Sequence, residues 1–381
     1  MKEGLVAGPS DENELAEAVA NADGPLCIKG GGTRRIGAPV AGTELSLAGL
    51  SGITLYEPEA LTIVARAGTP VAEIEVALSR ENQRLPFEPM DHRPLLGTEG
   101  TPTIGGVVAA NVSGPRRIAA GACRDSLIGV RYVDGAGTIV KNGGRVMKNV
   151  TGYDLVKLMA GSYGTLGVLS EVSFKLLPAN AAGGTVMVDG LSPTDAVSAL
   201  ATALGSPFEV SGAAHIPEGP DGAPVTMLRV EGFETQVTYR TAELSKLLSR
   251  FGVARIDTDP ASVAKTWADI RDVTALAGTL QDIWRISVKP TDGARVAEAL
   301  EGAKLLLDWG GGLVWAGVAP RTDVRAALMG IPGHATLMRP APGTAGAFEA
   351  FHPEPPAVAA IASGLRQKFD PRGILNPGLM G

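Results

Sequence analysis

Three glycine-rich segments in the first half of the chain constrain its fold more than any other feature. The first, Lys29-Gly30-Gly31-Gly32-Thr33-Arg34, directly follows Leu26-Cys27-Ile28, which is short and apolar enough for a buried strand. The second spans residues 103–114, and the third spans residues 161–167. Glycine lets backbone N–H groups converge on an anion because no Cβ stands in the way. Three such segments suit an extended ligand contacted along its length, and a dinucleotide is such a ligand.

Each glycine segment also has a plainer explanation, and the common nucleotide motifs are missing. The first run equally fits an ordinary turn, and Gly106 with Ala109-Ala110 fits tight packing of a helix. After Gly30-x-Gly32, the last glycine position of the Rossmann fingerprint holds Arg35. No Gly-x4-Gly-Lys-Ser/Thr P-loop occurs in the chain. The sequence therefore predicts neither of these two nucleotide-binding folds.

Composition narrows the class of protein. Hydrophobic residues make up 45% of the 381 residues and charged residues 19%, which supports a sizeable core and excludes wholesale disorder. The net charge of −6 gives no electrostatic case for nucleic-acid binding. Two cysteines, Cys27 and Cys123, cannot build a disulfide framework or a four-thiolate cluster. No apolar run approaches the roughly 18 residues of a membrane span, and residues 1–4 lack the apolar stretch of a signal peptide. We therefore expect a soluble, cytoplasmic α/β protein.

The first 180 residues alternate between short strands and short helices. Helices are expected after Ser10 or Asp11, after Thr69-Pro70 and over residues 153–160, because caps precede apolar residues at helical spacing. Expected strands cover residues 26–28, 53–57, 61–67, 127–133, 138–141 and 166–177.

Beyond residue 180 the order of elements becomes that of a ferredoxin-like motif. A β-α-β-β-α-β order is expected between residues 185 and 256. A helix over residues 262–272 links it to a second, looser copy between residues 283 and 338. A linker rich in proline and glycine and a helix over residues 357–369 follow.

The order of the glycine segments resembles that of the vanillyl-alcohol-oxidase-type, or PCMH-type, FAD-binding fold. The resemblance rests on Lys-Gly-Gly-Gly-Thr at 29–33, Thr-Ile-Gly-Gly at 103–106 with Asn-x-Ser-Gly at 111–114, and Gly-Thr-Leu-Gly-Val-Leu-Ser-Glu at 164–171. Residues 369–378, Phe-Asp-Pro-Arg-Gly-Ile-Leu-Asn-Pro-Gly, are similar to that superfamily's closing segment. Within the superfamily, residues 113–117, 146–155 and 158–162 look closest to the smaller flavin-binding subunits of bacterial glycolate oxidases. The match covers residues 10–178 and the carboxyl end, and the middle is matched only by size and element order.

This resemblance implies an α+β chain in three parts. A PCMH-type FAD-binding domain would span residues 1–180, with two α/β subdomains at about 1–55 and 56–180. A cap domain built on an antiparallel sheet with ferredoxin-like elements would span residues 181–340. Residues 341–381 would return to the FAD domain. FAD would lie between the parts, because ligand pockets favour domain interfaces.

The resemblance also implies which residues bind FAD. The loop at 29–34 would hold the pyrophosphate through backbone N–H groups and Arg34, and glycine would let the backbone approach the flat isoalloxazine. The expected FAD-binding residues are Lys29, Gly30, Gly31, Gly32, Thr33, Arg34, Asp91, Thr103, Gly105, Gly106, Asn111, Ser113, Gly114, Gly167 and Val168. Some members attach flavin through a histidine in or just after the first loop. Thr33-Arg34-Arg35 contains none, so we expect non-covalent FAD.

The substrate side of the site is less defined. Related 2-hydroxy-acid dehydrogenases use paired histidines and a carboxylate as metal ligands and base, whereas His92, His215, His334 and His352 form no close pair in this sequence. We therefore expect no metal site and assign no catalytic base. Arg285 is the candidate anchor for a substrate carboxylate, because a guanidinium binds carboxylate bidentately. The alternative is an ordinary outward-facing cation on an alternating strand.

The function implied is that of an FAD-dependent glycolate oxidase or dehydrogenase subunit, which converts a small 2-hydroxy acid to the 2-oxo acid. Expected partners are a larger FAD-binding subunit and an iron–sulfur subunit that takes the electrons, since two cysteines cannot supply a cluster here. The chain would act only within this hetero-oligomer, in the cytoplasm, with any membrane association made through its partners. A basic cluster, Arg116, Arg117 and Arg124, would lie near the flavin or at a subunit contact. Two alternatives stay open: a non-catalytic flavin subunit for electron relay or assembly, and a flavin-free interaction scaffold.

Overall fold

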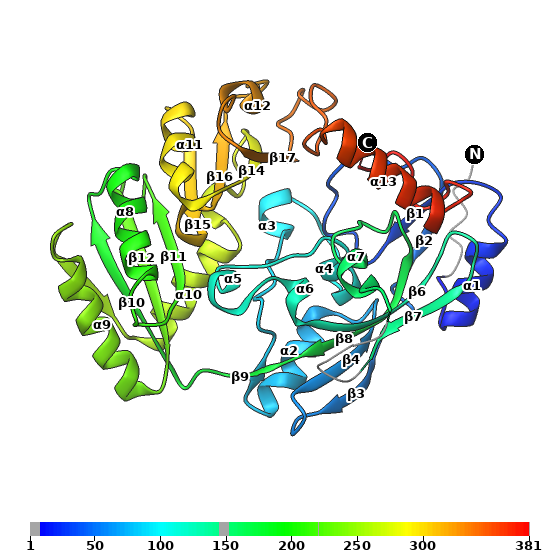
Figure 1. Ribbon diagram of the computed structural model, residues 1–381, viewed down its shortest axis with the longest axis horizontal. Helices are drawn as coiled ribbons and strands as arrows, with labels where there is room; N and C mark the ends of the chain where they lie inside the picture. Colours follow the sequence, from blue (N-terminus) through cyan, green and yellow to red (C-terminus); the bar gives the residue numbers. More distant parts are fainter. Residues whose placement is uncertain (1–7, 145–151, 220, 381) are drawn as a thin grey trace.

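Two large antiparallel sheets dominate the molecule (Figure 1). The computed structural model describes residues 8–144, 152–219 and 221–380. A five-stranded sheet is built from the first half of the chain, and an eight-stranded sheet is built from residues 182–339. Residues 1–4, in which we expected no signal peptide, and residues 146–151 of the family-like segment lie outside the described residues.

The amino-terminal layer contains α1 (Glu12–Ala20) and the parallel strands β1 (Leu26–Lys29) and β2 (Thr43–Ser46). The helix begins where its sequence predicts, because the Asp11 carboxylate accepts hydrogen bonds from the backbone N–H groups of Asn13 and Glu14. Leu375 also forms a parallel bridge with Leu26. The carboxyl end of the chain therefore lies against this first layer.

The five-stranded sheet has the order β3-β4-β8-β6-β7. Its strands are β3 (Ile53–Glu57), β4 (Thr62–Arg66), β6 (Leu127–Val133), β7 (Ile139–Gly143) and β8 (Val168–Lys175). Helix α2 (Val71–Arg80) buries Val71, Ile74 and Leu78, the face that helical spacing predicts. Because β3 begins at Ile53, the expected subdomain boundary at 55/56 falls inside this strand.

Short elements connect these strands. The helices are α3 (Arg93–Leu96), α4 (Ile104–Ala109), α5 (Arg117–Ala120), α6 (Cys123–Ser126) and α7 (Leu155–Met159). The strands β5 (Gln83–Arg84) and β9 (Leu177–Pro178) pair where the chain leaves for the second sheet.

The eight-stranded sheet contains two ferredoxin-like units. The first is β10 (Ala182–Asp189), α8 (Pro193–Leu204), β11 (Val210–Ile216), β12 (Val225–Gly232), α9 (Glu234–Leu248) and β13 (Ala254–Asp257). The second is β14 (Asp282–Val288), α11 (Gly293–Ala299), β15 (Lys304–Asp308), β16 (Leu313–Val318), α12 (Val324–Ala327) and β17 (Gly333–Arg339). The strand order β13-β10-β12-β11-β15-β16-β14-β17 joins the units through β11 and β15, where His215 pairs with Leu307. The expected α+β fold with ferredoxin-like elements in an antiparallel cap sheet is confirmed.

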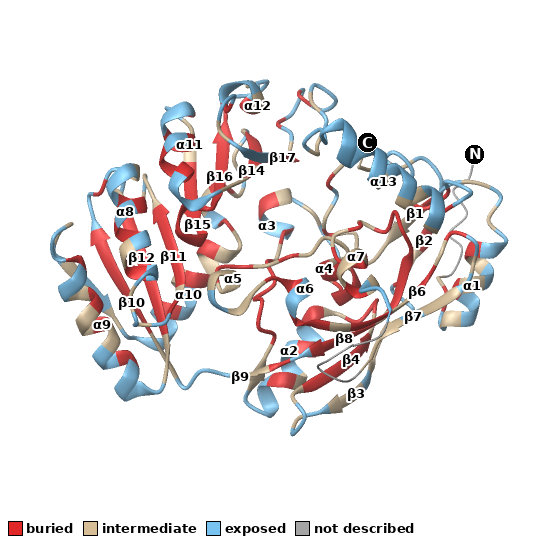
Figure 2. Ribbon diagram, viewed as in Figure 1, coloured by how far each residue is buried: buried red, intermediate tan, exposed pale blue. Residues whose placement is uncertain are grey.

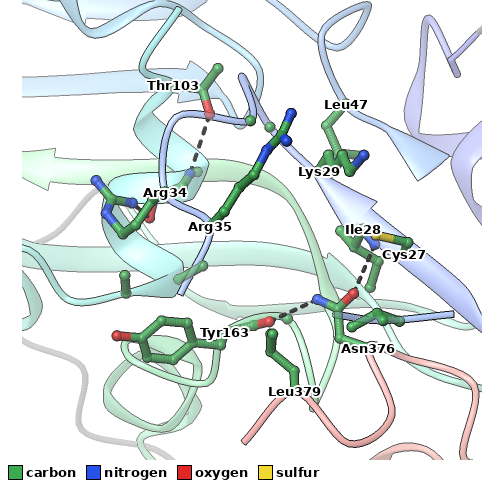
Figure 3. A pocket seen from close by; sticks show the side chains of 18 of the residues that line it. Cys27, Ile28, Lys29, Arg34, Arg35, Leu47, Thr103, Tyr163, Asn376 and Leu379 are labelled. Carbon is green, nitrogen blue, oxygen red and sulfur yellow. Dashed lines mark hydrogen bonds between the residues drawn. The ribbon is translucent and has the colours of Figure 1, made fainter. Parts of the chain in front are cut away.

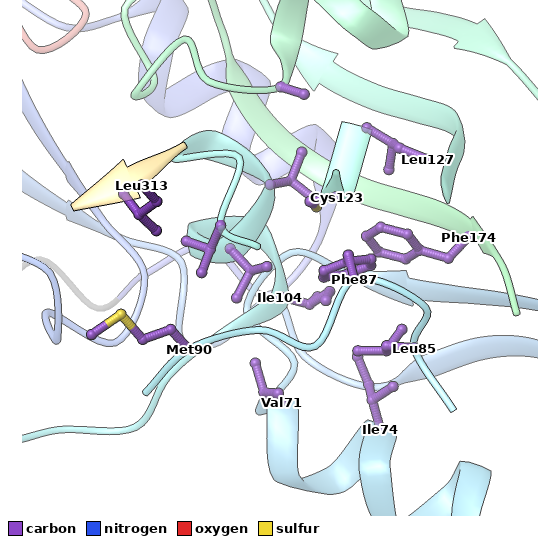
Figure 4. Close-up of a cluster of buried hydrophobic side chains, with 14 of the residues drawn as sticks. Val71, Ile74, Leu85, Phe87, Met90, Ile104, Cys123, Leu127, Phe174 and Leu313 are labelled. Carbon is purple, nitrogen blue, oxygen red and sulfur yellow. The ribbon is translucent and has the colours of Figure 1, made fainter. Parts of the chain in front are cut away.

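One hydrophobic cluster joins the two large sheets (Figure 4). Phe87 and Ile104 from the first half lie in the same cluster as Leu313 of β16 and Trp267 of α10 (Pro260–Arg271). Ile283 of β14 belongs to it as well, whereas Trp284 and Ile286 belong to a separate cluster. Since side chains alternate along a strand, Arg285 is on the face of the cap sheet that carries Ile283 and meets the FAD half.

The carboxyl-terminal segment returns across the surface of the first half. Helix α13 (Pro356–Phe369) contains no fully buried residue and is mainly exposed (Figure 2). Beyond it, Arg372 donates hydrogen bonds to the backbone carbonyls of Gly135 and Ala20, both at 3.0 Å. These contacts fix the tail that carries Leu375 and Asn376.

Candidate cofactor and substrate site

A cavity of about 530 Å³ opens between the loop after β1, helix α4, the loop before β8 and the carboxyl end (Figure 3). Most of the expected FAD-binding residues line it, namely Lys29, Gly30, Gly31, Gly32, Thr33, Arg34, Thr103, Gly105, Gly106, Gly167 and Val168. The three glycine segments are thus brought together around one space by the tertiary structure.

The first glycine loop presents backbone donors that have no acceptor among the described residues. None of the backbone N–H groups of residues 30–34 donates a hydrogen bond to another described residue. The loop is held from its other side, because the Thr33 carbonyl accepts a hydrogen bond of 2.8 Å from Thr98 Oγ1. Buried or partly buried N–H groups without partners are costly. A run of them on a cavity wall therefore fits an anionic ligand such as a diphosphate.

Glycine is required at positions 31 and 32 of this loop for different structural reasons. A Cβ at Gly31 would lie 1.6 Å from the carbonyl oxygen of Thr101, so the close approach of two backbone segments requires glycine there. Gly32 has φ +69°, and a Cβ built on it would meet nothing within 4 Å. Gly31 is thus explained by packing, whereas Gly32 faces open space next to the ligand cavity.

The wall opposite the loop is also closely packed. Thr103 caps α4 by accepting a hydrogen bond from Gly106 N at 3.4 Å. A Cβ at Gly105 would lie 2.7 Å from Ala67, and one at Gly167 would lie 2.6 Å from the Tyr132 ring. The plainer explanation, glycine for tight packing, therefore holds for these two positions, which line the cavity as well.

Three cationic side chains line the cavity, and they differ in their partners. The Arg34 guanidinium donates to the Gly106 carbonyl at 2.7 Å and to His92 Nδ1 at 3.4 Å, and burial lowers its pKa. Lys29 forms an ion pair of 2.5 Å with the exposed Glu44. Arg35 also lines the cavity and makes no hydrogen bond or ion pair with another described residue. Arg35 is therefore a cation of this loop without a partner among the described residues. Arg34, for which the resemblance implies a pyrophosphate contact, lines the same cavity and is held by the Gly106 carbonyl.

Four expected FAD-binding residues lie outside the lining of this cavity. The Asp91 carboxylate binds the Arg93 guanidinium at 2.7 Å, and Asn111 Oδ1 accepts from the Arg124 backbone N–H at 3.0 Å. Ser113 Oγ accepts from Cys123 N at 3.0 Å, and the Gly114 carbonyl accepts from Trp309 Nε1 at 3.1 Å. The structure therefore gives these four residues contacts within the protein.

Sequence reasoning did not single out Asn376 and Tyr163, which help to close the cavity. Asn376 Oδ1 accepts from Ile28 N at 2.8 Å, and its Nδ2 donates to the Tyr163 carbonyl at 2.9 Å (Figure 3). Tyr163 has φ +53°, and its ring meets Phe351 edge-on at 5.0 Å. The signal for Asn376 was present in the closing segment at 369–378. Tyr163 had no such signal, since a non-glycine residue in the left-handed region is visible only in the fold.

Arg285 belongs to β14, on the face of the cap sheet that meets the FAD half, and its charge acts on Tyr163 of the cavity lining. Its guanidinium is over the Trp309 ring at 5.3 Å and makes no hydrogen bond or ion pair with another described residue. Burial raises the pKa of Tyr163, and the charges of Arg34 and Arg285 partly offset this rise. Burial and the same two arginines hold the pKa of His92 well below its usual range. The four side chains therefore share one electropositive region, which contradicts the interpretation of Arg285 as an ordinary outward-facing cation.

The basic cluster expected near the flavin is divided in the structure. Arg116 forms a buried ion pair of 2.7 Å with Glu231 of the cap, and Arg117 lies over Trp309 at 4.6 Å. Arg124 is half exposed and lies 3.9 Å from Asp125. Arg116 and Arg117 thus hold the two sheets together.

Comparison with known proteins identifies the family. The FAD binding domain family matches residues 4–143, which include the first glycine loop and α4. The glycolate oxidase subunit GlcE of Escherichia coli (strain K12) is 37% identical over 362 residues, covering 93% of this chain and 92% of the relative. The chain belongs to the GlcE family of glycolate oxidase subunits. FAD is the cofactor of this family's FAD binding domain, and the unpaired N–H groups and Arg35 fit its diphosphate.

Another relative shares only part of the GlcE-family chain. A D-lactate dehydrogenase of Archaeoglobus fulgidus is 31% identical over 179 residues, which are 46% of this chain and 39% of the relative. Among solved structures, an alkyldihydroxyacetonephosphate synthase has a TM-score of 0.69 at 15% identity, covering 97% of this chain and 76% of that chain. At that identity the likeness supports the fold alone.

No described helix is long and apolar enough to cross a membrane. No three described His, Cys, Asp or Glu residues form a metal-binding group.

Proposed function

We propose that this chain is the FAD-binding subunit of a glycolate oxidase or dehydrogenase complex, and that it oxidises a small 2-hydroxy acid to the 2-oxo acid. The observation that supports this most directly is the position of Arg285. The Arg285 guanidinium, which has no hydrogen-bond or ion-pair partner among the described residues, is on the inner face of the cap, and its charge acts on Tyr163, which lines a cavity suited to FAD. A small anionic substrate placed between them has its carboxylate at one end and the cofactor at the other.

Each part of the site has a separate task in this proposal. The backbone N–H groups of residues 30–34 and the Arg35 guanidinium hold the diphosphate of FAD without a covalent bond. Arg285 holds the substrate carboxylate, and Tyr163 forms the wall between the two. FAD, when bound, supplies the acceptor for the two electrons of the alcohol. We assign no catalytic base.

We further propose that the chain acts with partner subunits in the cytoplasm. The relative GlcE is by its name one subunit of an oxidase. The partners proposed are a larger FAD-binding subunit and an iron–sulfur subunit, which receives electrons that Cys27 and Cys123 cannot relay as a cluster. Any membrane association is made through these partners. The division into parts at 1–180, 181–340 and 341–381 stays part of this proposal.

The test is anaerobic flavin reduction by glycolate, D-lactate and L-lactate, using the chain alone and the chain assembled with its partners. We expect glycolate to bleach the flavin absorbance of the assembled complex and to act slowly on the chain alone. If this subunit's FAD is not reduced in the assembled complex by any of these acids, the chain is a relay or assembly subunit. Purification without bound flavin would support the scaffold alternative. Flavin that stays with acid-precipitated protein would contradict non-covalent binding.

The role of Arg285 has its own test. Arg285→Gln is expected to raise KM for glycolate about tenfold or more, because a charge-assisted carboxylate contact is lost. Arg250→Gln is the control, since Arg250 is exposed on the same domain and lies 4.7 Å from the Phe251 ring centroid. An unchanged KM in Arg285→Gln would contradict the assignment.

A further inference from the structure

Trp309 holds an unusual backbone conformation at the end of β15. Its φ is +53°, and it is followed by Gly310 at +67° and Gly311 at +102°. The Asp308 carboxylate accepts a hydrogen bond of 2.7 Å from the Trp309 backbone N–H and stabilises this turn. A bulky residue in the left-handed region is strained. A tryptophan kept there indicates that the position of its indole matters.

The indole of Trp309 connects the cap to the FAD half. Its Nε1–H donates a hydrogen bond of 3.1 Å to the carbonyl of Gly114. The guanidinium of Arg117 lies 4.6 Å from the ring centroid, and that of Arg285 lies 5.3 Å from it. The backbone around Gly114, whose carbonyl accepts this bond, is itself held in place, because Gly114 N donates to the Phe87 carbonyl at 2.9 Å. One ring therefore meets two cations and a backbone carbonyl from both halves of the molecule.

We propose that Trp309 is the positioning residue that holds the Arg285 guanidinium in place for the substrate carboxylate. This inference rests on the proposed function of Arg285. A cation–π contact uses the ring face and leaves the N–H edges of the guanidinium free for a planar anion. Arg285 has no hydrogen-bond partner among the described residues, so the indole face is a specific contact that limits the freedom of its guanidinium.

The charges around this contact favour an anion. Arg117 places a second positive charge over the same ring, and Arg34 acts on the neighbouring Tyr163. Asp308, an acidic group of the cap whose charge acts on Arg285, is buried, and burial raises its pKa to about 7. It is therefore a weak counter-ion at neutral pH, and the two guanidinium groups stay available to a carboxylate.

The test compares Trp309→Leu with Trp309→Phe in the FAD-loaded protein. Two quantities decide the test: the dissociation constant of oxalate by calorimetry on the FAD-loaded chain, and KM for glycolate in the assembled complex. The kcat for glycolate is measured alongside KM. Trp309→Leu removes the aromatic face, so oxalate affinity and KM are each expected to worsen about fivefold to tenfold, with a smaller change in kcat. Trp309→Phe keeps a ring under Arg285 and is expected to recover much of the loss. In the double variant, Trp309→Leu is expected to add little to the loss of oxalate affinity that Arg285→Gln alone causes.

Trp267 provides a matched control, because it also lies under a guanidinium and donates an indole hydrogen bond. Its ring centroid is 4.5 Å from Arg229, and its Nε1 donates to Thr185 Oγ1 at 3.0 Å. Equal losses of oxalate affinity in Trp267→Leu and Trp309→Leu would show a general structural effect and overturn the proposal. If Arg285→Gln weakens oxalate binding but both Trp309 variants do not, the positioning role is wrong and the Arg285 assignment stands. If Arg285→Gln itself changes neither quantity, the proposed function of Arg285 fails. Should Trp309→Leu not fold, Trp309→Phe is compared with Trp267→Phe, since each variant loses one indole hydrogen bond. A small loss of oxalate affinity in Trp309→Phe alone supports the proposal, and equal oxalate affinities in the two variants overturn it.

Discussion

Arg229 of the cap and Glu88 of the FAD half form a buried bidentate ion pair in which both N–O distances are 3.0 Å. Arg116 and Glu231 extend it, with 3.2 Å between Arg116 and Glu88 and 2.7 Å between Arg116 and Glu231. Glu88 has φ +52°, so a strained backbone position is kept in order to place this carboxylate. These four residues, here called the inter-sheet ion cluster, link the two halves of the molecule beside the hydrophobic cluster.

Removing one member of the inter-sheet ion cluster should be strongly destabilising. In Glu88→Gln, Arg229 keeps its charge but loses its main buried counter-ion. We expect the free energy of unfolding to fall by about 3 kcal/mol, which urea denaturation monitored by circular dichroism measures. Asp269→Asn is the control, because its pair with Lys265 is exposed and is worth under about 1 kcal/mol. A loss in Glu88→Gln no larger than that of the control would contradict the structural role.

Gly32 tests the FAD loop better than Gly31, whose replacement would clash with Thr101 whether or not FAD is bound. Gly32→Val places methyl groups in open space beside the unpaired N–H groups, and we expect most bound FAD to be lost. Gly278 is matched, because both glycines have φ +69° and nothing within 4 Å of a built Cβ. Both variants should lose about 1–2 kcal/mol of stability from backbone strain, but only Gly32→Val should lose FAD. The ratio of flavin to protein absorbance measures this, and full FAD content in Gly32→Val would contradict the loop assignment.

Arg35→Gln should weaken FAD binding without destabilising the protein that lacks FAD. The guanidinium has no partner to lose among the described residues, whereas a hydrogen bond to a charged diphosphate is worth about 1.5–3 kcal/mol. We therefore expect the dissociation constant of FAD to rise about tenfold or more, measured by quenching of flavin fluorescence. Arg80→Gln, at an exposed position of α2, should leave it unchanged. Equal FAD affinity in Arg35→Gln and wild type would remove Arg35 from the site.

The raised pKa of Asp308 should make stability fall as pH rises. Burial raises this pKa to about 7 in the folded protein, whereas an unfolded aspartate has a pKa of about 3.9. The protonated form is favoured only in the folded state, so this stabilisation is full below about pH 4 and is lost as pH rises towards about 7. The slope is at most about 1.4 kcal/mol per pH unit.

Asp308→Asn removes that titration and keeps an oxygen for the Trp309 N–H. Urea denaturation between about pH 5 and about pH 8 should show the wild type losing stability relative to Asp308→Asn as pH rises. The effect of Glu231 on the pH dependence of stability has the opposite sign, because Arg116 and Arg229 hold the pKa of Glu231 well below its usual range despite burial. A difference between the two proteins that is independent of pH would show that Asp308 is ionised throughout.

The sequence by itself determined the strands of the two large sheets, the longer helices and the family, whereas β2 and the short helices α3, α5 and α6 were not predicted. Alternation, caps and turn residues are local, so the helix after Asp11, the strands of both sheets and the two ferredoxin-like units could be placed from spacing alone. The glycine segments could be assigned to one ligand because their order along the chain matches that of an FAD-binding family. Local patterns carry this information because each depends on neighbouring residues only.

The tertiary structure decided which side chains face one another. Arg34 and Arg35 are adjacent and chemically alike, yet only the fold ties Arg34 to Gly106 and leaves Arg35 without a partner in the described part of the chain. Asn111 and Gly114 belong to a glycine segment, but their contacts go to Arg124 and Trp309 instead of the cavity. The meeting of Arg285, Trp309 and Gly114 joins residues far apart in the chain. Such contacts depend on how two sheets pack, and no local pattern of residues encodes them.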